Sequence, residues 1–468
     1  MCVLKNKDVP SERELAIMAL VAVIEDKAYS NIALNNILTM HKLNSQQKSF
    51  ITQLVKGTIR NLIYIDYILS SFSKAALNKI EPLILANLRI SIYQLKYMDK
   101  VPVYAICNEA VRLSKIQTKK PLAGFVNGIL RAVARNIDNI ELPTPDLNYI
   151  EHLSVKYSYQ PWIIEHFISE LDKDDTLKML NIVNDPPKIT IAINKTKTTK
   201  AKLIELLRHE GVNVQEIKEP KQLSEYALIL SKTDDISCLK SFKDGLFNVM
   251  DIGAMLAVIA AISNMPKKPK SNFFAQSDNI IDLCAAPGGK SFFVAYNSNA
   301  SILATDIYPK KVNIISSAIA RLGLDNIKTS VADACITDKN LINTADLLIL
   351  DMPCSGFGVV RKKPEIKLFK NKKDLEDLVN MQRRILSASY EYVKPKKYIL
   401  YITCTINKSE NLDNIQWFIQ NYPFKLLDFS QNMPDIPAYL TAKKGYVQIL
   451  PHHFNSDAFF VAVMKRSE

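Results

Sequence analysis

Apolar residues recur at helical spacing through the first 140 residues of the chain. Ser11 and Glu14 form a capping box in front of the apolar segment LAIMALVAVI. The same spacing continues through 49–72 and 81–98, and two further segments, 102–117 and 121–136, begin with proline, which favours the first turn of a helix. The pattern predicts a compact all-helical domain over residues 1–140.

The pattern changes after the proline-marked segment LPTPDLNYIEHL, which we interpret as a linker. KITIAINK (188–195) alternates as a strand does, and TTKAKLIELLRHEGV reads as a capped helix that ends at Gly211. The strand-like stretches YALILS and GLFNVMD follow. Together they predict a small α/β segment over residues 145–250.

From residue 251 onward, strand, turn and helix alternate. The predicted strands are NIIDLC (279–284), SILATD (301–306), KTSVAD (328–333), ADLLILD (345–351) and KYILYIT (397–403), with helices between them. Nearly continuous apolar strands alternating with helices indicate a mostly parallel sheet that is covered on both faces. Residues 251–468 are therefore predicted to form an α/β domain, and ligands bind such sheets beyond the carboxyl ends of their strands.

Composition narrows the class of protein. The 468 residues contain no apolar run long enough to span a membrane, and the first apolar segment lacks the basic lead-in of a signal peptide, so we expect a cytoplasmic protein. The seven cysteines form no CxxC pair, which argues against a zinc site and a disulfide framework. A net charge of +13 favours nucleic acid as a partner, although a Lys-rich composition alone also produces such a charge.

Glycine is scarce, and four of the twelve glycines fall in two predicted strand-end turns. CAAPGGKS (284–291) contains two of them, and such a turn lets backbone N–H groups approach a ligand at a helix N-terminus. Asp306 ends the next strand, where it can either accept hydrogen bonds from ribose hydroxyls or cap the following helix. Asp333 can hold an adenine amino group, with the same alternative. These strand ends indicate a nucleoside-bearing cofactor.

Two further strand ends carry reactive groups. DMPCSGFG places Asp351 and Cys354 at one of them, and ITCT places Cys404 at another. A lone cysteine is more often a core residue, but two at strand ends favour chemistry. A thiolate that adds to carbon 6 of a pyrimidine makes carbon 5 able to attack a methyl donor. The basic run RKKPEIKLFKNKK (361–373) follows and either binds phosphates or forms a solvated face.

These motifs resemble those of a known family. CAAPGGK, DMPCSGFG and YITCT, in that order, are similar to the cofactor and cysteine motifs of bacterial S-adenosylmethionine-dependent small-subunit (16S) ribosomal RNA cytosine-C5 methyltransferases with a NusB-like helical domain. NEAVRLSK and FVNGILR resemble the NusB-like domain, IAINKTKTT resembles the strand that opens the methyltransferase part, and LPHHFNSDAFFVAVMKR resembles its final strand. The resemblance covers almost the whole chain.

The resemblance implies a multidomain fold. An all-α NusB-like RNA-binding domain (1–140) would be followed by a small α/β linking subdomain (145–250) and a Rossmann-like catalytic domain with a mostly parallel sheet (251–468). It also implies methylation of carbon 5 of a cytosine in small-subunit ribosomal RNA, with S-adenosyl-L-methionine as cofactor. We expect a monomer that needs neither metal nor membrane.

The resemblance also implies roles for individual residues. Cys404 would be the nucleophile at cytosine C6, Cys354 would help to remove the C5 proton or release the product, and Asp351 would hydrogen-bond the base. The cofactor site would comprise Cys284, Ala285, Ala286, Pro287, Gly288, Gly289, Lys290, Asp306, Asp333 and Asp351. RNA-binding residues would include Arg361, Lys362, Lys363 and Arg131, alongside a basic surface formed by Arg112, Lys115, Lys119, Lys120 and Arg135.

Four residues depart from the family pattern. Ala458 replaces a usual glycine before the final strand, Lys396 and Lys397 replace a common glycine pair, and Met250 stands where glutamine is expected. They adjoin the predicted site, so we expect them to affect rate and RNA affinity more than reaction type.

Three other functions remain open from the sequence. A non-catalytic RNA-binding assembly factor would tolerate loss of Cys404, Cys354 or the CAAPGGK turn, yet all three are intact. A dithiol redox enzyme is disfavoured because these cysteines lack CxxC spacing. A transfer-RNA cytosine-5 methyltransferase is a variant in substrate, since a basic helical domain can bind any structured RNA.

Overall fold

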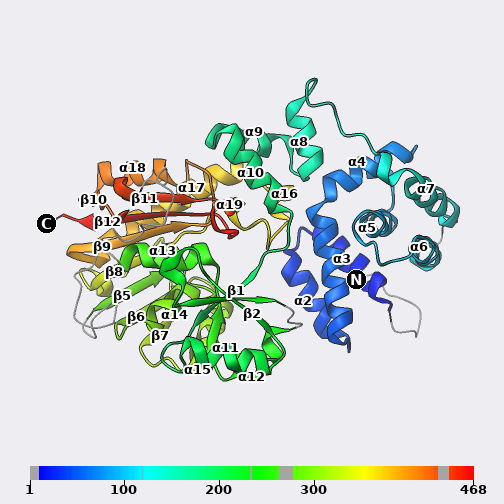
Figure 1. Ribbon diagram of the computed structural model, residues 1–468. Helices are drawn as coiled ribbons and strands as arrows, with labels where there is room; N and C mark the ends of the chain where they lie inside the picture. Colours follow the sequence, from blue (N-terminus) through cyan, green and yellow to red (C-terminus); the bar gives the residue numbers. More distant parts are fainter. Residues whose placement is uncertain (1–9, 119, 232–234, 263–277, 431–441, 468) are drawn as a thin grey trace. The chain divides into compact units, whose positions relative to one another are not determined.

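The chain folds into two compact units. The computed structural model describes residues 10–118, 120–231, 235–262, 278–430 and 442–467, so Lys119 and Cys2 lie outside it (Figure 1). One unit comprises Met1–Asn184 with Lys362–Phe369, and the other comprises Asp185–Arg361 with Lys370–Glu468. Within the described ranges, no helix has both the length and the apolar character needed to cross a bilayer.

The first unit is helical, as predicted. Ser11 caps its first helix by accepting a hydrogen bond from the Glu14 N–H, and fully buried residues such as Leu20, Leu54 and Leu88 form its core. Its first seven α-helices are α1 (Glu12–Ile24), α2 (Ser30–Met40), α3 (Ser45–Arg60), α4 (Leu62–Phe72), α5 (Pro82–Tyr97), α6 (Val103–Gln117) and α7 (Ala123–Asn136).

Three more helices extend this unit beyond the predicted helical region. They are α8 (Tyr149–Tyr157), α9 (Pro161–Glu170) and α10 (Lys173–Val183). The interpretation of 142–153 as a linker is therefore wrong for its second half. Asn148 caps α8 through the Glu151 N–H, and Pro161 occupies the first turn of α9, so residues that usually signal a loop here begin helices.

A short segment from late in the chain completes the helical unit. Lys362–Phe369 includes α16 (Ile366–Phe369) and contacts the core of this unit through Leu368 and Phe369. Glu365 accepts hydrogen bonds from the N–H and the hydroxyl of Ser30. The predicted basic run is thus neither a free phosphate-binding loop nor a solvated face along its whole length.

The second unit begins with a small antiparallel sheet of order β2-β3-β1-β4. The predicted strands and helix in this region are present. The elements are β1 (Ile189–Ile193), α11 (Lys200–His209), β2 (Asn213–Glu216), β3 (Ala227–Ser231), α12 (Lys240–Lys243) and β4 (Phe247–Val249).

The main sheet has the order β10-β12-β9-β8-β5-β6-β7, with β11 paired to β12. The five predicted strands are all present and pair in parallel, whereas β10, β11 and β12 pair antiparallel. The strands are β5 (Asn279–Leu283), β6 (Ser301–Asp306), β7 (Ile327–Val331), β8 (Ala345–Asp351), β9 (Val393–Thr403), β10 (Phe424–Leu426), β11 (Tyr446–Ile449) and β12 (Phe459–Arg466).

Helices cover both faces of this sheet, as expected. One face packs against α13 (Ile252–Ile262), α14 (Gly289–Tyr296) and α15 (Pro309–Leu322), and the other against α17 (Lys372–Ser389) and α18 (Leu412–Asn421). A four-residue helix, α19 (Pro451–Phe454), precedes β12. One expected helix is missing, because only a short 3₁₀ turn, Lys339–Leu341, lies between β7 and β8.

Candidate active site

The two strand-end thiols lie in direct contact. Asp351 at the end of β8 pairs with Ile402 of β9, so the segments that leave these two strands start side by side. Cys354 Sγ and Cys404 Sγ are 3.2 Å apart, and the Cys404 N–H donates to Cys354 Sγ at 3.3 Å. The sheet register thus produces the proximity that the sequence predicts.

A glycine permits this approach. The Gly358 N–H donates to the Cys404 carbonyl at 2.9 Å, and the Gly358 carbonyl accepts from the Ala458 N–H at 3.0 Å. A Cβ at Gly358 would lie 2.3 Å from the Ala458 oxygen and 2.7 Å from the Cys404 oxygen, closer than atoms can approach. The hydrogen bond between the Cys354 loop and the Cys404 carbonyl therefore requires glycine at position 358.

Lys290 and Asp351 form an ion pair beside the thiols. Lys290 Nζ lies 2.5 Å from Asp351 Oδ2, with the lysine side chain 11% exposed. Burial opposes the lysine charge, but Asp351, Asp282 and Cys404 together outweigh it, so the pKa of Lys290 rises. The site thus keeps a cation that can stabilise negative charge on Cys404.

The CAAPGGK turn brings the N-terminus of α14 to the same edge. Gly288 adopts a φ of +102°, which favours glycine, and the Ala285 N–H donates to the Thr305 carbonyl of β6 at 2.8 Å. A Cβ added at Gly289 would make only ordinary van der Waals contacts, with Asn248 and Met250 at 3.9 Å. Burial, followed by nearby carboxylates, raises the pKa of the Cys284 thiol to about 12, so this third cysteine stays protonated.

Asp306 and Asp333 both lie at this edge with local partners. Asp306 Oδ1 accepts from the Tyr308 N–H at 3.1 Å, and Lys311 Nζ lies 3.4 Å from Oδ2. Asp333 Oδ1 accepts from the Cys335 N–H at 2.9 Å. Each carboxylate accepts from the N–H two residues on, which is a turn contact, and α15 has Tyr308 and not Asp306 as its N-cap, so the alternative of a helix cap is not observed at Asp306. The assignments to ribose and adenine stay predictions.

The predicted RNA-binding residues occupy different environments. Arg131 and Lys363 are exposed, and Lys362 is half-buried. Arg361 is 2% exposed, and its guanidinium donates to the carbonyls of Asp185 and Pro186 and to the Asn455 side chain. Arg361 therefore connects the segments around Asp185 and Asn455 within the second unit.

A buried polar network that the sequence did not predict lies behind the thiols. Its centre is Glu410, which is 0% exposed and accepts hydrogen bonds from Ser355, Gln382 and Asn407. The signal was the polar run NKSEN (407–411), one residue after ITCT, which resembles an ordinary helix-capping loop. Only the tertiary structure shows that its glutamate points inward.

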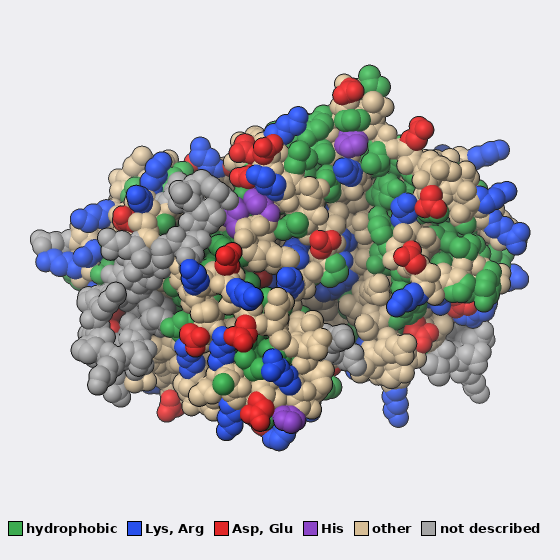
Figure 2. Space-filling view, viewed as in Figure 1, with side chains coloured by type: hydrophobic (Ala, Val, Ile, Leu, Met, Phe, Trp, Pro, Cys, Tyr) green, Lys and Arg blue, Asp and Glu red, His purple; other side chains and the backbone are tan. Residues whose placement is uncertain are grey.

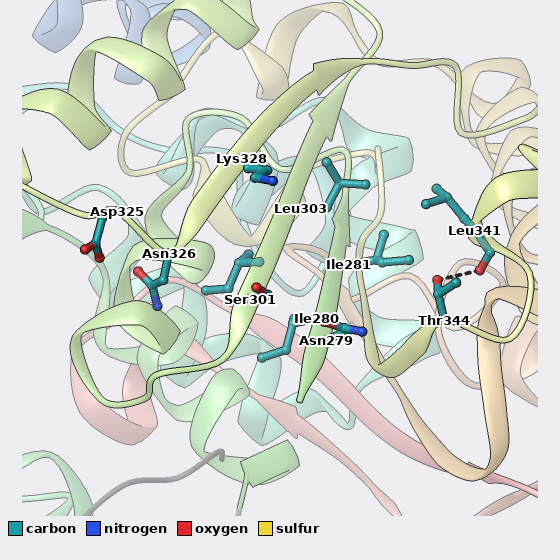
Figure 3. Close-up of a pocket in the computed structure, with 11 residues that line it drawn as sticks. Asn279, Ile280, Ile281, Ser301, Leu303, Asp325, Asn326, Lys328, Leu341 and Thr344 are labelled. Carbon is teal, nitrogen blue, oxygen red and sulfur yellow. Dashed lines mark hydrogen bonds between the residues drawn. The ribbon is translucent and has the colours of Figure 1, made fainter. Parts of the chain in front are cut away.

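A cavity of about 290 Å³ lies at the opposite edge of the sheet (Figure 3). Asn279, Ser301 and Thr344 line it, and they mark the amino ends of β5, β6 and β8. It includes none of the predicted site residues. The thiols, Lys290 and the glycine turn lie instead at the carboxyl edge.

Comparisons with known proteins identify the family of this chain. Three family models match: the NusB family at residues 10–135, the ferredoxin-like domain of RsmF/B-like methyltransferases at 159–237, and the 16S rRNA methyltransferase RsmB/F at 274–465. The probable ribosomal RNA small subunit methyltransferase B of Bacillus subtilis is 33% identical over 97% of this chain and 99% of its own length. Its namesake from Synechocystis is 28% identical over 98% and 100%.

Solved structures share the fold. The crystal structure of PH0851 aligns with a TM-score of 0.79 at 23% identity and covers 99% of this chain and 100% of its own. NSun6 from Pyrococcus horikoshii aligns with a TM-score of 0.54 at 20% identity over 65% and 97%. Identity to the Bacillus protein over nearly the full length of both chains decides the classification. The chain belongs to the RsmB/F family of 16S rRNA methyltransferases, which are S-adenosylmethionine-dependent RNA methyltransferases.

Proposed function

We propose that this protein methylates carbon 5 of a cytosine in small-subunit ribosomal RNA, through a covalent bond between Cys404 and cytosine C6. The observation that supports it most strongly is the contact of two thiols, 3.2 Å apart, beside a buried lysine–aspartate pair. An enzyme that methylated an exocyclic nitrogen or a ribose would have no use for this nucleophile. The names of the relatives support ribosomal RNA as the substrate.

The carboxyl edge of the sheet fits S-adenosylmethionine. Helix α14 begins at Gly289 without a side-chain cap, and the N–H groups of such a helix N-terminus suit a cofactor carboxylate. Asp306 is 4% exposed at the end of β6, where a ribose would lie, and Asp333 follows β7. When bound, the cofactor supplies an electrophilic methyl group.

The residues then perform covalent catalysis. The Cys404 thiolate adds to C6, which forms the S–C6 bond and places the electron pair on C5. Asp351, fixed by Lys290, hydrogen-bonds the base near N3 and stabilises the adduct. After C5 has formed its bond to the methyl group, loss of the C5 proton returns its electron pair to the ring and expels the Cys404 thiolate.

Cys354 is suited to the later steps of this reaction, the loss of the C5 proton and the release of Cys404. The hydrogen bond with Cys404, followed by burial and by the charges of Cys404 and Glu410, raises the pKa of the Cys354 thiol well above its usual value. Cys354 therefore carries the proton while Cys404 attacks. At 3.2 Å it is close enough to return a proton to the departing sulfur or to assist removal of the C5 proton.

The helical domain over residues 1–140 would hold the RNA, with the subdomain over 145–250 linking it to the catalytic residues 251–468. Lys and Arg side chains gather along the edge formed by α6 and α7 (Figure 2). Exposed members include Arg112, Lys115, Lys120, Arg131 and Arg135. Lys362 and Lys363 offer further phosphate contacts, and such contacts set position rather than sequence preference.

The proposal is tested with full-length protein, methyl-labelled S-adenosylmethionine and small-subunit ribosomal RNA. Mass spectrometry of the digested RNA should identify 5-methylcytidine as the product. Cys404→Ser should lower kcat by about a thousandfold or more, because the nucleophile is lost.

Cys238, an exposed cysteine far along the chain from either motif, provides the matched control. Cys238→Ser should retain wild-type activity. Transfer of the methyl group to any other atom, or full activity of Cys404→Ser, would contradict the proposal.

A further inference from the structure

We propose that Glu410 is the positioning residue for both cysteines: it fastens their two loops together and keeps the shared proton on Cys354, so that Cys404 is the nucleophile. This inference rests on the proposed function. Glu410 lies six residues after Cys404 and contacts neither sulfur in a hydrogen bond, so it acts through its neighbours rather than on substrate.

Glu410 holds the Cys354 loop through the next residue. The Ser355 N–H donates to Glu410 Oε2 at 2.8 Å, and the Ser355 hydroxyl donates to Oε1 at 2.5 Å. Gln382 of α17 adds a second hold, because its Nε2 donates both to Glu410 Oε2 and to the Pro353 carbonyl, each at 2.9 Å. Glu410 thus holds Ser355 directly and Pro353 through Gln382, on either side of Cys354.

The same carboxylate holds the Cys404 loop. Asn407 Nδ2 donates to Glu410 Oε1 at 3.0 Å, and Thr405 Oγ1 lies 2.7 Å from Ser355 Oγ. The contact between Thr405 and Ser355 joins the residues that directly follow the two cysteines. Charge-assisted hydrogen bonds of this kind are stronger than neutral ones, so the two loops move as one body.

The position of the charge matters as much as the hydrogen bonds. Glu410 is fully buried, and Ser355, Gln382 and Asn407 are neutral donors. A neutral glutamine has nearly the same shape, so packing alone does not call for a buried charge, which is costly. The negative charge contributes to the raised pKa of Cys354, after the hydrogen bond with Cys404 and burial.

The opposite charge acts on the other thiol. Lys290, 11% exposed, interacts electrostatically with Cys404. One thiol of the pair is thus influenced by a carboxylate and the other by an ammonium group. Because the sulfurs lie 3.2 Å apart within hydrogen-bond contact, this asymmetry favours Cys354 as the member of the pair that keeps its proton.

The test measures thiol reactivity without RNA or cofactor, so it can fail independently of the proposed reaction. Wild-type full-length protein is treated with iodoacetamide across a pH series, and mass spectrometry reports alkylation at Cys354 and Cys404 separately. The wild type should react first at Cys404. Glu410→Gln, which removes the charge and keeps the shape, should reduce that preference by about tenfold, equivalent to one pKa unit.

Two matched variants separate charge from packing. Glu376→Gln makes the same charge change at an exposed position of α17. Its pH profile of alkylation should be the same as that of the wild type. Glu410→Asp keeps the charge but draws the carboxylate back from Ser355. It should keep the preference for Cys404 and lower kcat by about a hundredfold with KM for RNA unchanged, because the loops lose their alignment.

The proposal would be overturned if a folded Glu410→Gln protein showed a lower Tm but the wild-type pH profile of cysteine alkylation. Glu410 would then have only a structural role. If Glu410→Gln does not fold, Glu410→Asp decides: wild-type kcat in that variant would overturn it equally.

Discussion

At the scale of single residues, Asp282 on β5 is a carboxyl group buried with only part of its hydrogen-bonding capacity used. It is fully buried, its Oδ2 accepts from the Ser291 hydroxyl, and its Oδ1 has no hydrogen-bond partner among the described residues. Burial raises the pKa of Asp282 to about 7. The folded protein therefore keeps a proton that the unfolded chain has already lost over much of the acidic range.

This shift predicts a pH-dependent stability. Between about pH 4 and pH 7 the unfolded state binds fewer protons than the folded state, so the free energy of unfolding falls as pH rises and levels off above the folded pKa. Asp282→Asn retains an acceptor for Ser291 and removes this titration. Its Tm should fall less than that of the wild type between about pH 5 and pH 8.

Thermal unfolding of both proteins across that range measures the difference, with the exposed Glu376→Gln as control. Parallel pH profiles of Tm for wild type and Asp282→Asn would contradict the assignment.

At the scale of elements, β9 carries a bulge at the two lysines that replace an expected glycine pair. The pairing with β8 shifts between Ala345 and Leu347, and Lys396 adopts a φ of +63°. Lys397 Nζ lies 2.8 Å from Asp346 Oδ1, a carboxylate that is 5% exposed. Lys396 therefore occupies a backbone conformation that glycine favours, whereas Lys397 has acquired an ion pair.

Opposite effects are expected from the two neighbouring substitutions. Lys396→Gly relieves the left-handed strain and should raise the free energy of unfolding by up to about 1 kcal/mol. Lys397→Gly removes one partner of Asp346, which keeps Lys394, and should lower it by up to about 1 kcal/mol. Denaturant unfolding of the two variants checks the signs, and equal signs would show that the bulge does not act as described.

The sequence predicts contacts that follow from strand pairing, but not the buried contacts of polar side chains. The strands and the contact between Cys354 and Cys404 were predictable because apolar runs fix parallel strands and parallel strands end at one edge. The inward orientation of Glu410 and of Lys367 was not, because polar residues of a loop become buried only when distant partners satisfy them. The helix α8 was missed because prolines at 143 and 145 precede it.

At the scale of the whole molecule, the active-site loop continues directly into the helical unit. Fully buried Lys367 donates to the carbonyls of Arg60 and Tyr157 and to Asn184 Oδ1, at 2.8, 2.8 and 2.9 Å. Burial, with the nearby Arg60 charge, lowers the pKa of Lys367. The segment eight to fifteen residues after Cys354 therefore packs within the helical unit.

This arrangement predicts that the helical unit is incomplete without the late segment. A fragment of residues 1–184 should unfold at a lower temperature than the same helices in the full chain. The carbonyls of Arg60 and Tyr157 lose their donor Lys367, and Ser30 loses its acceptor Glu365. A synthetic peptide of residues 361–370 should raise its Tm.

A peptide with leucine at the position of Lys367 and alanine at that of Glu365 is the matched control and should not stabilise the fragment. A fragment as stable alone as in the full chain would contradict this role.

The central claim, covalent catalysis by two cysteines with separate roles, is tested most directly by trapping the bond to RNA. Wild type, Cys354→Ala and Cys404→Ala are each mixed with S-adenosylmethionine and small-subunit ribosomal RNA, denatured in SDS and separated by electrophoresis. Cys354→Ala should accumulate an SDS-stable protein–RNA adduct, because attack by Cys404 survives while release fails, and Cys404→Ala should form none. An adduct in Cys404→Ala, or none in Cys354→Ala, would contradict the account.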